Sequence, residues 1–282
     1  MSGTLYVVGT PIGNLGDMSP RGVSALETAD FIAAEDTRVT VKLLNHFGIK
    51  KEMLSYYEHN KSTKGNLIIK RLLEGESCAL VSDAGMPAIS DPGEDLVRLC
   101  INEGIEVIPL PGACAFTTAL IASGMPTGRF SFEGFLTTNK RNRKIHLTEV
   151  KDDTRTLIFY EAPHKLTYTL KDMLDVLGDR EIVLARELTK KFEEFYRTTI
   201  SEALTHYEAT PPKGEFVLII KGADKKELEE TRKSTLPPPE DLIREYFKKG
   251  LRGKELTGYV AEVLGLPKRE VYDIYLKIKD TL

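Results

Sequence analysis

Three loops rich in glycine and other small residues follow short apolar runs in the first half of the chain. They are GTPIGNLGD (9–17), SDAGMPAISDPG (82–93) and PLPGACA (109–115). Loops of this kind let backbone N–H groups approach an anionic or polar ligand closely. Their spacing matches neither GxGxxG nor GxxxxGK[ST]. Each loop alone could be a tight turn, but three of them at one sheet edge predict a ligand pocket.

Charged residues gather at three further places where a predicted strand ends. These are AEDTR (34–38), FYEAPHK (159–165) and ARELTK (185–190). In the first, Asp36 could cap a helix and pair with Arg38, or the segment could contact a substrate. In the other two, the charges could be solvated or could belong to a site. The residues alone leave these alternatives open.

The run TNKRNRKIH (138–146) carries four basic residues in five positions and no carboxylate. It is a candidate for contacts with phosphate groups, and its alternative is a solvated helix start or loop. The tail from residue 240 to 282 reads as helical, and within it the segment 256–278 has the pattern of a helix, a turn containing glycine and a second helix. That tail is almost neutral, so a nucleic-acid contact and a structural or dimerising bundle both remain open.

The elements that must position these residues alternate between strands and helices as far as residue 122, which predicts a mostly parallel α/β sheet. Short apolar runs predict its strands at 5–8, 31–34, 53–56, 79–82 and 106–108. After the Gly-Met-Pro break at 124–126, runs at 130–135, 156–161, 182–187, 194–199 and 216–221 predict a second, partly antiparallel sheet. We therefore expect domains at 1–124 and 125–222, a charged and proline-rich linker at 223–239, and a helical domain at 240–282.

Composition narrows the function classes. The 39 Lys and Arg residues are fewer than the 42 Asp and Glu residues, so a polyanion would have to meet a local basic patch. The three cysteines lie far apart without CxxC spacing or a nearby histidine cluster, so we expect neither a disulfide scaffold nor a metal site. No apolar run is long enough for a membrane span and no signal peptide begins the sequence, so we expect a cytoplasmic protein without a membrane partner.

Six motifs, in their order and spacing, closely resemble the tetrapyrrole methylase superfamily, in its branch that methylates small-subunit ribosomal RNA. They are VVGTPIGNLGD, AEDTR, SDAGMPAISDPG, PGACAFTTAL, GFL before the basic run, and FYEAPHK. The resemblance covers about residues 3–221, and the helical tail is also similar. It implies two α/β domains with the donor cleft between them, plus a small C-terminal helical domain. It further implies S-adenosylmethionine (AdoMet) as donor, 2′-O-methylation of a cytidine ribose in the decoding region of 16S rRNA, and a homodimer.

The resemblance also implies which residues hold the donor. Residue by residue, the matching motif positions are Pro11, Ile12, Asp83, Gly85, Met86, Cys114 and Ala115, and a looser alignment adds Phe159, Ala185 and Glu215. The second loop reads Ser-Asp-Ala where relatives carry a Gly-Asp-Pro type, which leaves its backbone path open. Cys114 stands where relatives usually have Ser, so we interpret it as a packing or hydrogen-bonding substitute and not as a nucleophile.

Methyl transfer to a ribose hydroxyl needs alignment and a group that accepts the hydroxyl proton. The candidates are Asp36, Glu133, Glu161, Glu187 and Lys190. Our hypothesis is that Glu187 lies closest to the substrate, with Arg186 orienting the phosphate and Lys190 nearby. We expect RNA phosphates to meet the basic run through Lys140, Arg141, Arg143 and Lys144.

Three other functions compete with this interpretation. Methylation of a small tetrapyrrole would use the same fold but would need neither the basic run nor the helical tail. A non-catalytic RNA- or DNA-binding module would leave the three small-residue loops without a purpose. A NAD-dependent oxidoreductase is disfavoured because GxGxxG is missing.

Overall fold

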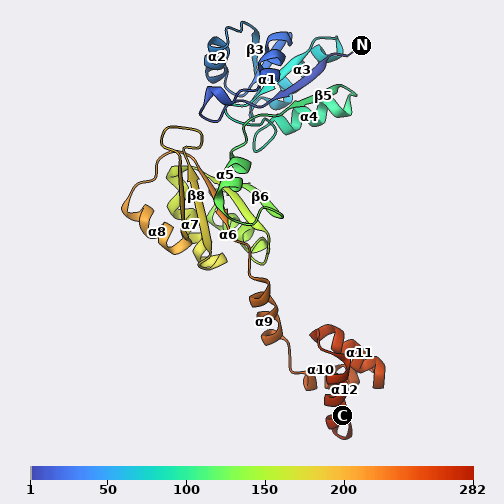
Figure 1. The fold of residues 1–282 in the computed structure, drawn as a ribbon. Coiled ribbons are helices and arrows are strands. Elements are labelled where there is room, and N and C mark those ends of the chain that lie inside the picture. The colour runs from blue at the N-terminus through green and yellow to red at the C-terminus, as the bar shows by residue number, and fades with distance from the viewer. Residues whose placement is uncertain (1) are drawn as a thin grey trace. The chain divides into compact units, whose positions relative to one another are not determined.

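The computed structural model describes residues 2–282, with the backbone alone at 231–235 and 280. It divides the chain into two compact units, 1–222 and 223–282. The first unit contains two five-stranded sheets flanked by helices, and the second is helical (Figure 1). The predicted fold class, α/β with two sheets and a C-terminal helical part, is confirmed.

The first sheet is parallel throughout and has the strand order β3 (Glu52–Ser55), β2 (Phe31–Ala34), β4 (Cys78–Val81), β1 (Thr4–Val8), β5 (Glu106–Leu110). A short 3-10 turn, η1 (Leu15–Asp17), precedes its first helix. Helices α1 (Pro20–Thr28) and α2 (Thr37–His46) cover one face of the sheet through Leu26 and Leu44. Helices α3 (Lys61–Leu73) and α4 (Gly93–Asn102) cover the other face through Ile68 and Leu96. Both faces are therefore buried, which explains the continuous apolar strand sequences.

The second sheet is mixed and has the strand order β6 (Phe130–Phe135), β7 (Thr156–Glu161), β10 (Phe216–Ile220), β8 (Glu181–Arg186), β9 (Glu194–Thr199). Only the β6–β7 pairing is parallel among these described strands, and the other three pairings are antiparallel. The prediction of antiparallel pairing is confirmed for β7, β8, β9 and β10. A β-bulge between Phe132 and Gly134 bends β6 beside the site described below.

Helices cover both faces of the second sheet. On one face lie α6 (Lys140–Glu149), η2 (Pro163–Lys165), α7 (Leu166–Leu177) and α8 (Ile200–Ala209). On the other face lies α5 (Ala115–Ser123), which packs through Ala119 and Leu120. Helix α5 precedes the domain boundary expected after residue 124, yet its core contacts are with the second sheet.

The second unit consists of α9 (Lys225–Thr235), α10 (Pro239–Lys248), α11 (Gly253–Leu264), α12 (Lys268–Ile278) and η3 (Lys279–Thr281). Helices α10, α11 and α12 share a core built around Ile243, Leu256, Val260 and Val271. The predicted glycine turn lies at Gly265, whose φ of 63° ends α11. The segment 223–239, which we expected to be a linker, contains helix α9 and is therefore helical over most of its length.

Candidate functional site

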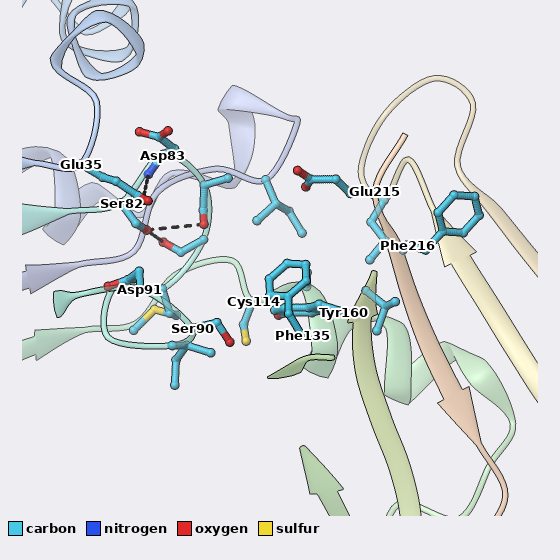
Figure 2. Close-up of a pocket in the computed structure, with 18 of the residues that line it drawn as sticks. Glu35, Ser82, Asp83, Ser90, Asp91, Cys114, Phe135, Tyr160, Glu215 and Phe216 are labelled. Carbon is cyan, nitrogen blue, oxygen red and sulfur yellow. Dashed lines mark hydrogen bonds between the residues drawn. The ribbon is translucent and has the colours of Figure 1, made fainter. Parts of the chain in front are cut away.

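A pocket of about 340 Å³ lies where loops of the first sheet face the second sheet (Figure 2). Its wall on the first side comes from segments that follow β1, β2, β4 and β5, namely Ile12, Glu35, Ser82–Met86, Ile89–Asp91, Cys114 and Ala115. Its wall on the second side consists of Phe135, Tyr160, Glu187, Leu188, Lys190 and Glu215–Val217. The three small-residue loops thus meet at one site, as their position after parallel strands predicts.

Backbone contacts that need small residues hold the three loops together. Thr10 and Gly85 form an isolated β-bridge, with N···O distances of 2.8 and 3.1 Å. The Thr10 hydroxyl also donates to the carbonyl of Ser82 at 3.2 Å. A Cβ added to Gly9 would come within 2.8 Å of the Gly112 Cα, so the first and third loops touch through two glycines. The pocket floor is consequently a fixed backbone surface.

Backbone strain is confined to the loops beside the pocket. Over residues 2–282, the non-glycine residues with positive φ are Ala88 (67°), Ser90 (65°), Glu187 (52°) and Thr189 (65°). The first two belong to the loop after β4, and the other two to the loop between β8 and β9. Asp91 supports the first pair, because its Oδ1 accepts from the N–H groups of Ala88 and Gly93 at 2.9 and 2.7 Å. Strain of this kind is typical of functional sites.

Comparisons with known proteins decide the family. The family described as Tetrapyrrole (Corrin/Porphyrin) Methylases matches residues 4–204. A protein from Halalkalibacterium halodurans named Ribosomal RNA small subunit methyltransferase I is 53% identical over 97% of this chain and 94% of that protein. A Bacillus subtilis protein of the same name is 48% identical over 97% of this chain and 94% of its own length. This chain belongs to the ribosomal RNA small subunit methyltransferase I family of tetrapyrrole methylases. It is therefore a methyltransferase.

Solved structures agree with this family at the level of the fold. Uroporphyrin-III-C-methyltransferase from Thermus thermophilus superposes with a TM-score of 0.56 at 16% identity, over 77% of this chain and 94% of that one. Diphthine synthase superposes with a TM-score of 0.60 at 14% identity, over 78% of this chain and 90% of that one. At such identities the likeness concerns the tetrapyrrole methylase fold alone.

The pocket of this methyltransferase is rich in carboxylates. Glu35, Asp83, Asp91, Glu187 and Glu215 line it, whereas Lys190 is the one cation among the lining residues that the structure describes. Burial, reinforced by the neighbouring carboxylates of Asp83, Asp91 and Asp36, raises the pKa of Glu35. Burial also raises the pKa of Asp83, with a further contribution from Asp36. The pocket therefore favours a ligand that carries positive charge.

The N-terminus of α5 opens onto the same pocket. Cys114 is the N-cap residue of α5, its side chain makes no capping hydrogen bond, and Cys114 and Ala115 both line the pocket. The backbone N–H of Phe116 donates to the Tyr160 hydroxyl at 3.2 Å. Burial raises the pKa of Tyr160 to about 12, so this hydroxyl keeps its proton at neutral pH. The helix terminus supplies a positive dipole end for an anionic group of a ligand.

Glu187 and Lys190 form an ion pair on the opposite wall. The Glu187 Oε1 lies 3.0 Å from the Lys190 Nζ, and both residues line the pocket. The close fit around Glu187 requires Gly214, where an added Cβ would lie 2.5 Å from Oε1. Lys190 in turn packs on Gly13 of the first loop, where an added Cβ would lie 2.7 Å from the Lys190 Cγ. The ion pair thus bridges from the second sheet toward the first loop.

The residues expected to hold a donor fall into two groups. Ile12, Asp83, Gly85, Met86, Cys114, Ala115 and Glu215 line the pocket together. Pro11 lines a neighbouring cavity instead. Phe159 and Ala185 are fully buried in the two cores of the second sheet, so their side chains are packing residues. At β7 the lining residue is Tyr160, one position further along, because successive strand residues face opposite sides of a sheet.

The other residues considered for proton transfer lie outside the pocket lining. Asp36 caps α2 through its Oδ1, which accepts from the Arg38 N–H at 2.8 Å, and the Arg38 side chain lowers its pKa to about 2. Glu133 is bonded to His146, with 2.9 Å between Oε2 and Nε2. Glu161 is buried and accepts from the Thr169 hydroxyl at 2.5 Å. Arg186 is ion-paired with Glu194 on β9.

The basic run forms the start of α6, which Asn139 caps by accepting from the Asn142 N–H at 3.1 Å. Lys140 and Arg141 are exposed there. Arg143 is buried, and its Nη2 lies 2.6 Å from the Asp172 carboxylate. The Nζ of Lys144 lies 2.9 Å from an Asp175 oxygen. The helix therefore presents two of the four basic side chains to solvent without a buried acidic partner.

Sequence reasoning did not assign Glu35, Ser90, Phe135 or Tyr160 to the pocket, although all four line it. Glu35 and Tyr160 lie within segments whose clustered charges were noted, so the segment was identified but not the residue. Ser90 lies in the second small-residue loop and Phe135 in the GFL motif, so for these two as well the segment was identified but not the residue. Among the described residues, no group of three or more potential ligands could hold a metal ion. No helix in this part of the chain is long and apolar enough to cross a bilayer.

Proposed function

We propose that this chain transfers a methyl group from AdoMet to the 2′-hydroxyl of a cytidine in the decoding region of 16S rRNA. The relatives named Ribosomal RNA small subunit methyltransferase I, at 42–53% identity, support the substrate class. One observation carries the site assignment. The ion pair of Glu187 and Lys190 lies in the wall of an acidic pocket, opposite the three small-residue loops.

Three properties of the described lining support AdoMet as the ligand: its charge, its apolar surface and its volume. Carboxylates at Glu35, Asp83 and Glu215 suit a cationic ligand, and the α5 terminus at Ala115 suits its carboxylate. Ile12, Met86, Leu188 and Val217 offer an apolar surface for its adenine ring. The volume of about 340 Å³ falls in the range of about 300–1,000 Å³ that is usual for ligand pockets. These residues, with Gly85 and Cys114, would hold the donor.

When bound, AdoMet supplies a methyl group already activated by its sulfonium, so the chain has to align the ribose hydroxyl and accept its proton. We assign proton acceptance to the Glu187 carboxylate. Lys190 positions that carboxylate through the 3.0 Å ion pair, and the tight contact with Gly214 limits its movement. Arg186 has no part in this scheme because Glu194 holds it.

The remaining features extend the proposal. Lys140 and Arg141 at the start of α6 would contact RNA phosphates, since they are exposed and basic. We place the donor loops in the domain 1–124, the proton acceptor in the domain 125–222, and a separate helical domain at 240–282 after the segment 223–239. By analogy with the family resemblance, we propose that the chain acts as a homodimer in the cytoplasm.

The test is methyl transfer from labelled AdoMet to three substrates in parallel: unmodified small ribosomal subunits, naked 16S rRNA and a corrinoid precursor. Nucleoside mass spectrometry of the RNA should find 2′-O-methylcytidine. Transfer to the corrinoid alone, with measurable AdoMet binding, would overturn the RNA assignment.

A further inference from the structure

A second cavity of about 260 Å³ lies between the first loop and helix α2. Pro11, Gly13 and Leu15 form its wall on the loop side, and Val39 and Leu43, one turn apart, form its wall on α2. Its polar lining residues are Thr10, Thr40, Lys42, Ser82 and Asp83. The family resemblance assigns no role to this cavity as a whole.

The second cavity adjoins the pocket proposed for the donor. Ser82 and Asp83 line both. In the first loop, Ile12 lines the donor pocket while its neighbours Pro11 and Gly13 line the second cavity. Gly13 also lies against Lys190, the partner of Glu187. A ligand group in the second cavity would therefore continue directly toward the proposed proton acceptor.

The contact surface of the second cavity is mainly apolar. The Thr10 hydroxyl donates a hydrogen bond to the Ser82 carbonyl at 3.2 Å, and the Thr40 hydroxyl donates one to the Asp36 carbonyl at 3.2 Å, so neither is free to bind a ligand as a donor. Apolar side chains thus dominate the contact surface, with Leu15 and Val39 43% and 38% exposed, respectively. Partly exposed apolar side chains beside a catalytic pocket mark a place where a ligand packs.

One edge of the cavity carries an unpaired positive charge. Lys42 is exposed, and none of the ion pairs recorded for the described residues involves it. Arg38, one turn earlier on α2, is paired with Asp36, which leaves Lys42 as the cation available to an incoming anion. An apolar slot with a lysine at its edge complements a nucleotide, whose base is flat and whose phosphate is negative.

We infer that the second cavity receives the unstacked pyrimidine base of the nucleotide to be methylated, with Lys42 contacting an RNA phosphate. This inference rests on the proposed function and adds its substrate subsite. A base held between Pro11 and Val39 leads its ribose to the junction at Gly13 and Asp83, beside Glu187 and Lys190. Enzymes that modify a nucleotide commonly take it out of its stack in this way.

Helix α2 offers a matched pair of variants. Val39 lines the cavity and is 38% exposed, whereas Val41 on the same helix is 37% exposed and lies outside the lining. Val39→Asp and Val41→Asp therefore place the same charge on the same helix at equal exposure. We expect Val39→Asp to raise the KM for unmodified small subunits by about 10-fold or more, because a carboxylate replaces the apolar contact with the base and must be desolvated there. Val41→Asp should leave that KM unchanged, and the AdoMet Kd should not change in either variant.

Lys42→Gln gives an independent readout. In this variant the slope of log Kd for RNA against log salt concentration should be smaller by about 1, because one contact between a lysine and a phosphate is lost. An unchanged slope would remove Lys42 from the subsite.

The outcomes separate the two proposals. If wild-type enzyme methylates rRNA and Val39→Asp behaves as Val41→Asp does, the base subsite is wrong and the proposed function stands. If Val39→Asp weakens AdoMet binding as strongly as it weakens RNA use, the cavity belongs to the donor and the subsite is again wrong. If wild-type enzyme transfers no methyl group to rRNA, the proposed function fails and the subsite fails with it.

Discussion

Gly9 and Gly112 lie back to back, so close that a Cβ on Gly9 would come within 2.8 Å of the Gly112 Cα and 2.6 Å of the Met86 sulfur. This contact joins the first and third loops under the proposed donor pocket. The pocket therefore depends on two residues that have no side chain of their own.

Gly9→Ala should destabilise the fold by about 1–3 kcal/mol, because the new methyl group overpacks a rigid backbone contact. It should also raise the AdoMet Kd, since Met86 lines the pocket. Urea unfolding and calorimetric titration measure the two effects. Gly128→Ala is the control, because an added Cβ there meets nothing within 4 Å. Equal stability of the two variants would refute the role assigned to the Gly9–Gly112 contact.

Asp83→Asn should separate stability from donor binding. Burial raises the pKa of Asp83, so this carboxyl stabilises the fold when protonated, and that contribution is lost as pH rises through the raised pKa. At pH 7 the Asp83→Asn variant, which carries no charge at this position, should have a higher Tm than wild type. The gain should disappear below the ordinary Asp pKa of about 3.8. AdoMet affinity at pH 7 should fall, because a negative charge is removed. A lower Tm together with unchanged AdoMet affinity would contradict this account.

The basic start of α6 should divide into a structural and an exposed part. Arg143→Ala should cost about 3–5 kcal/mol, because it removes the guanidinium 2.6 Å from the buried Asp172 carboxylate and leaves only the Lys144 ammonium, 3.6 Å away, as its recorded ion-pair partner. Arg141→Ala should leave the unfolding free energy unchanged and weaken RNA binding, with a shallower salt dependence. Chemical unfolding and RNA titration at several salt concentrations measure both. The division would be wrong if Arg141→Ala unfolded as readily as Arg143→Ala.

A chain that ends at Gly222 should fold and bind AdoMet as the full chain does. The first unit has cores of its own, and the second unit has a separate core. Circular dichroism and AdoMet titration of the shortened chain check this. Loss of its folded structure would show that the second unit is needed for stability.

The sequence predicts the framework well where the chemistry is local. The expected bounds of β2, β6, β7 and β9 are those of the structure, because each strand is a short apolar or alternating run between turn residues. Ser19 caps α1 by accepting from the Gly22 N–H at 3.0 Å, and Pro20 follows at the first helical position, a Ser-Pro pair that is typical of a helix start.

The site residues were less predictable where their role depends on which face of a strand they occupy or on a partner far away in the sequence. Phe159 and Tyr160 are neighbours in an apolar strand covered on both sides, and period two cannot say which of them faces the pocket when both faces are buried. Arg143 is adjacent to exposed basic residues in sequence, but its partner Asp172 lies on α7, and no local pattern reveals such a long-range pair.

The central claim is that Glu187 accepts the proton of the ribose hydroxyl, and it is tested most directly by the single-turnover methyl-transfer rate of Glu187→Gln at saturating AdoMet and rRNA. Gln has the same shape but cannot accept the proton as a carboxylate does. We predict a rate about 10²–10⁴-fold below that of wild type, measured with the donor site filled so that any change in AdoMet affinity does not enter. A Glu187→Gln enzyme that transfers the methyl group at the wild-type rate would contradict the account.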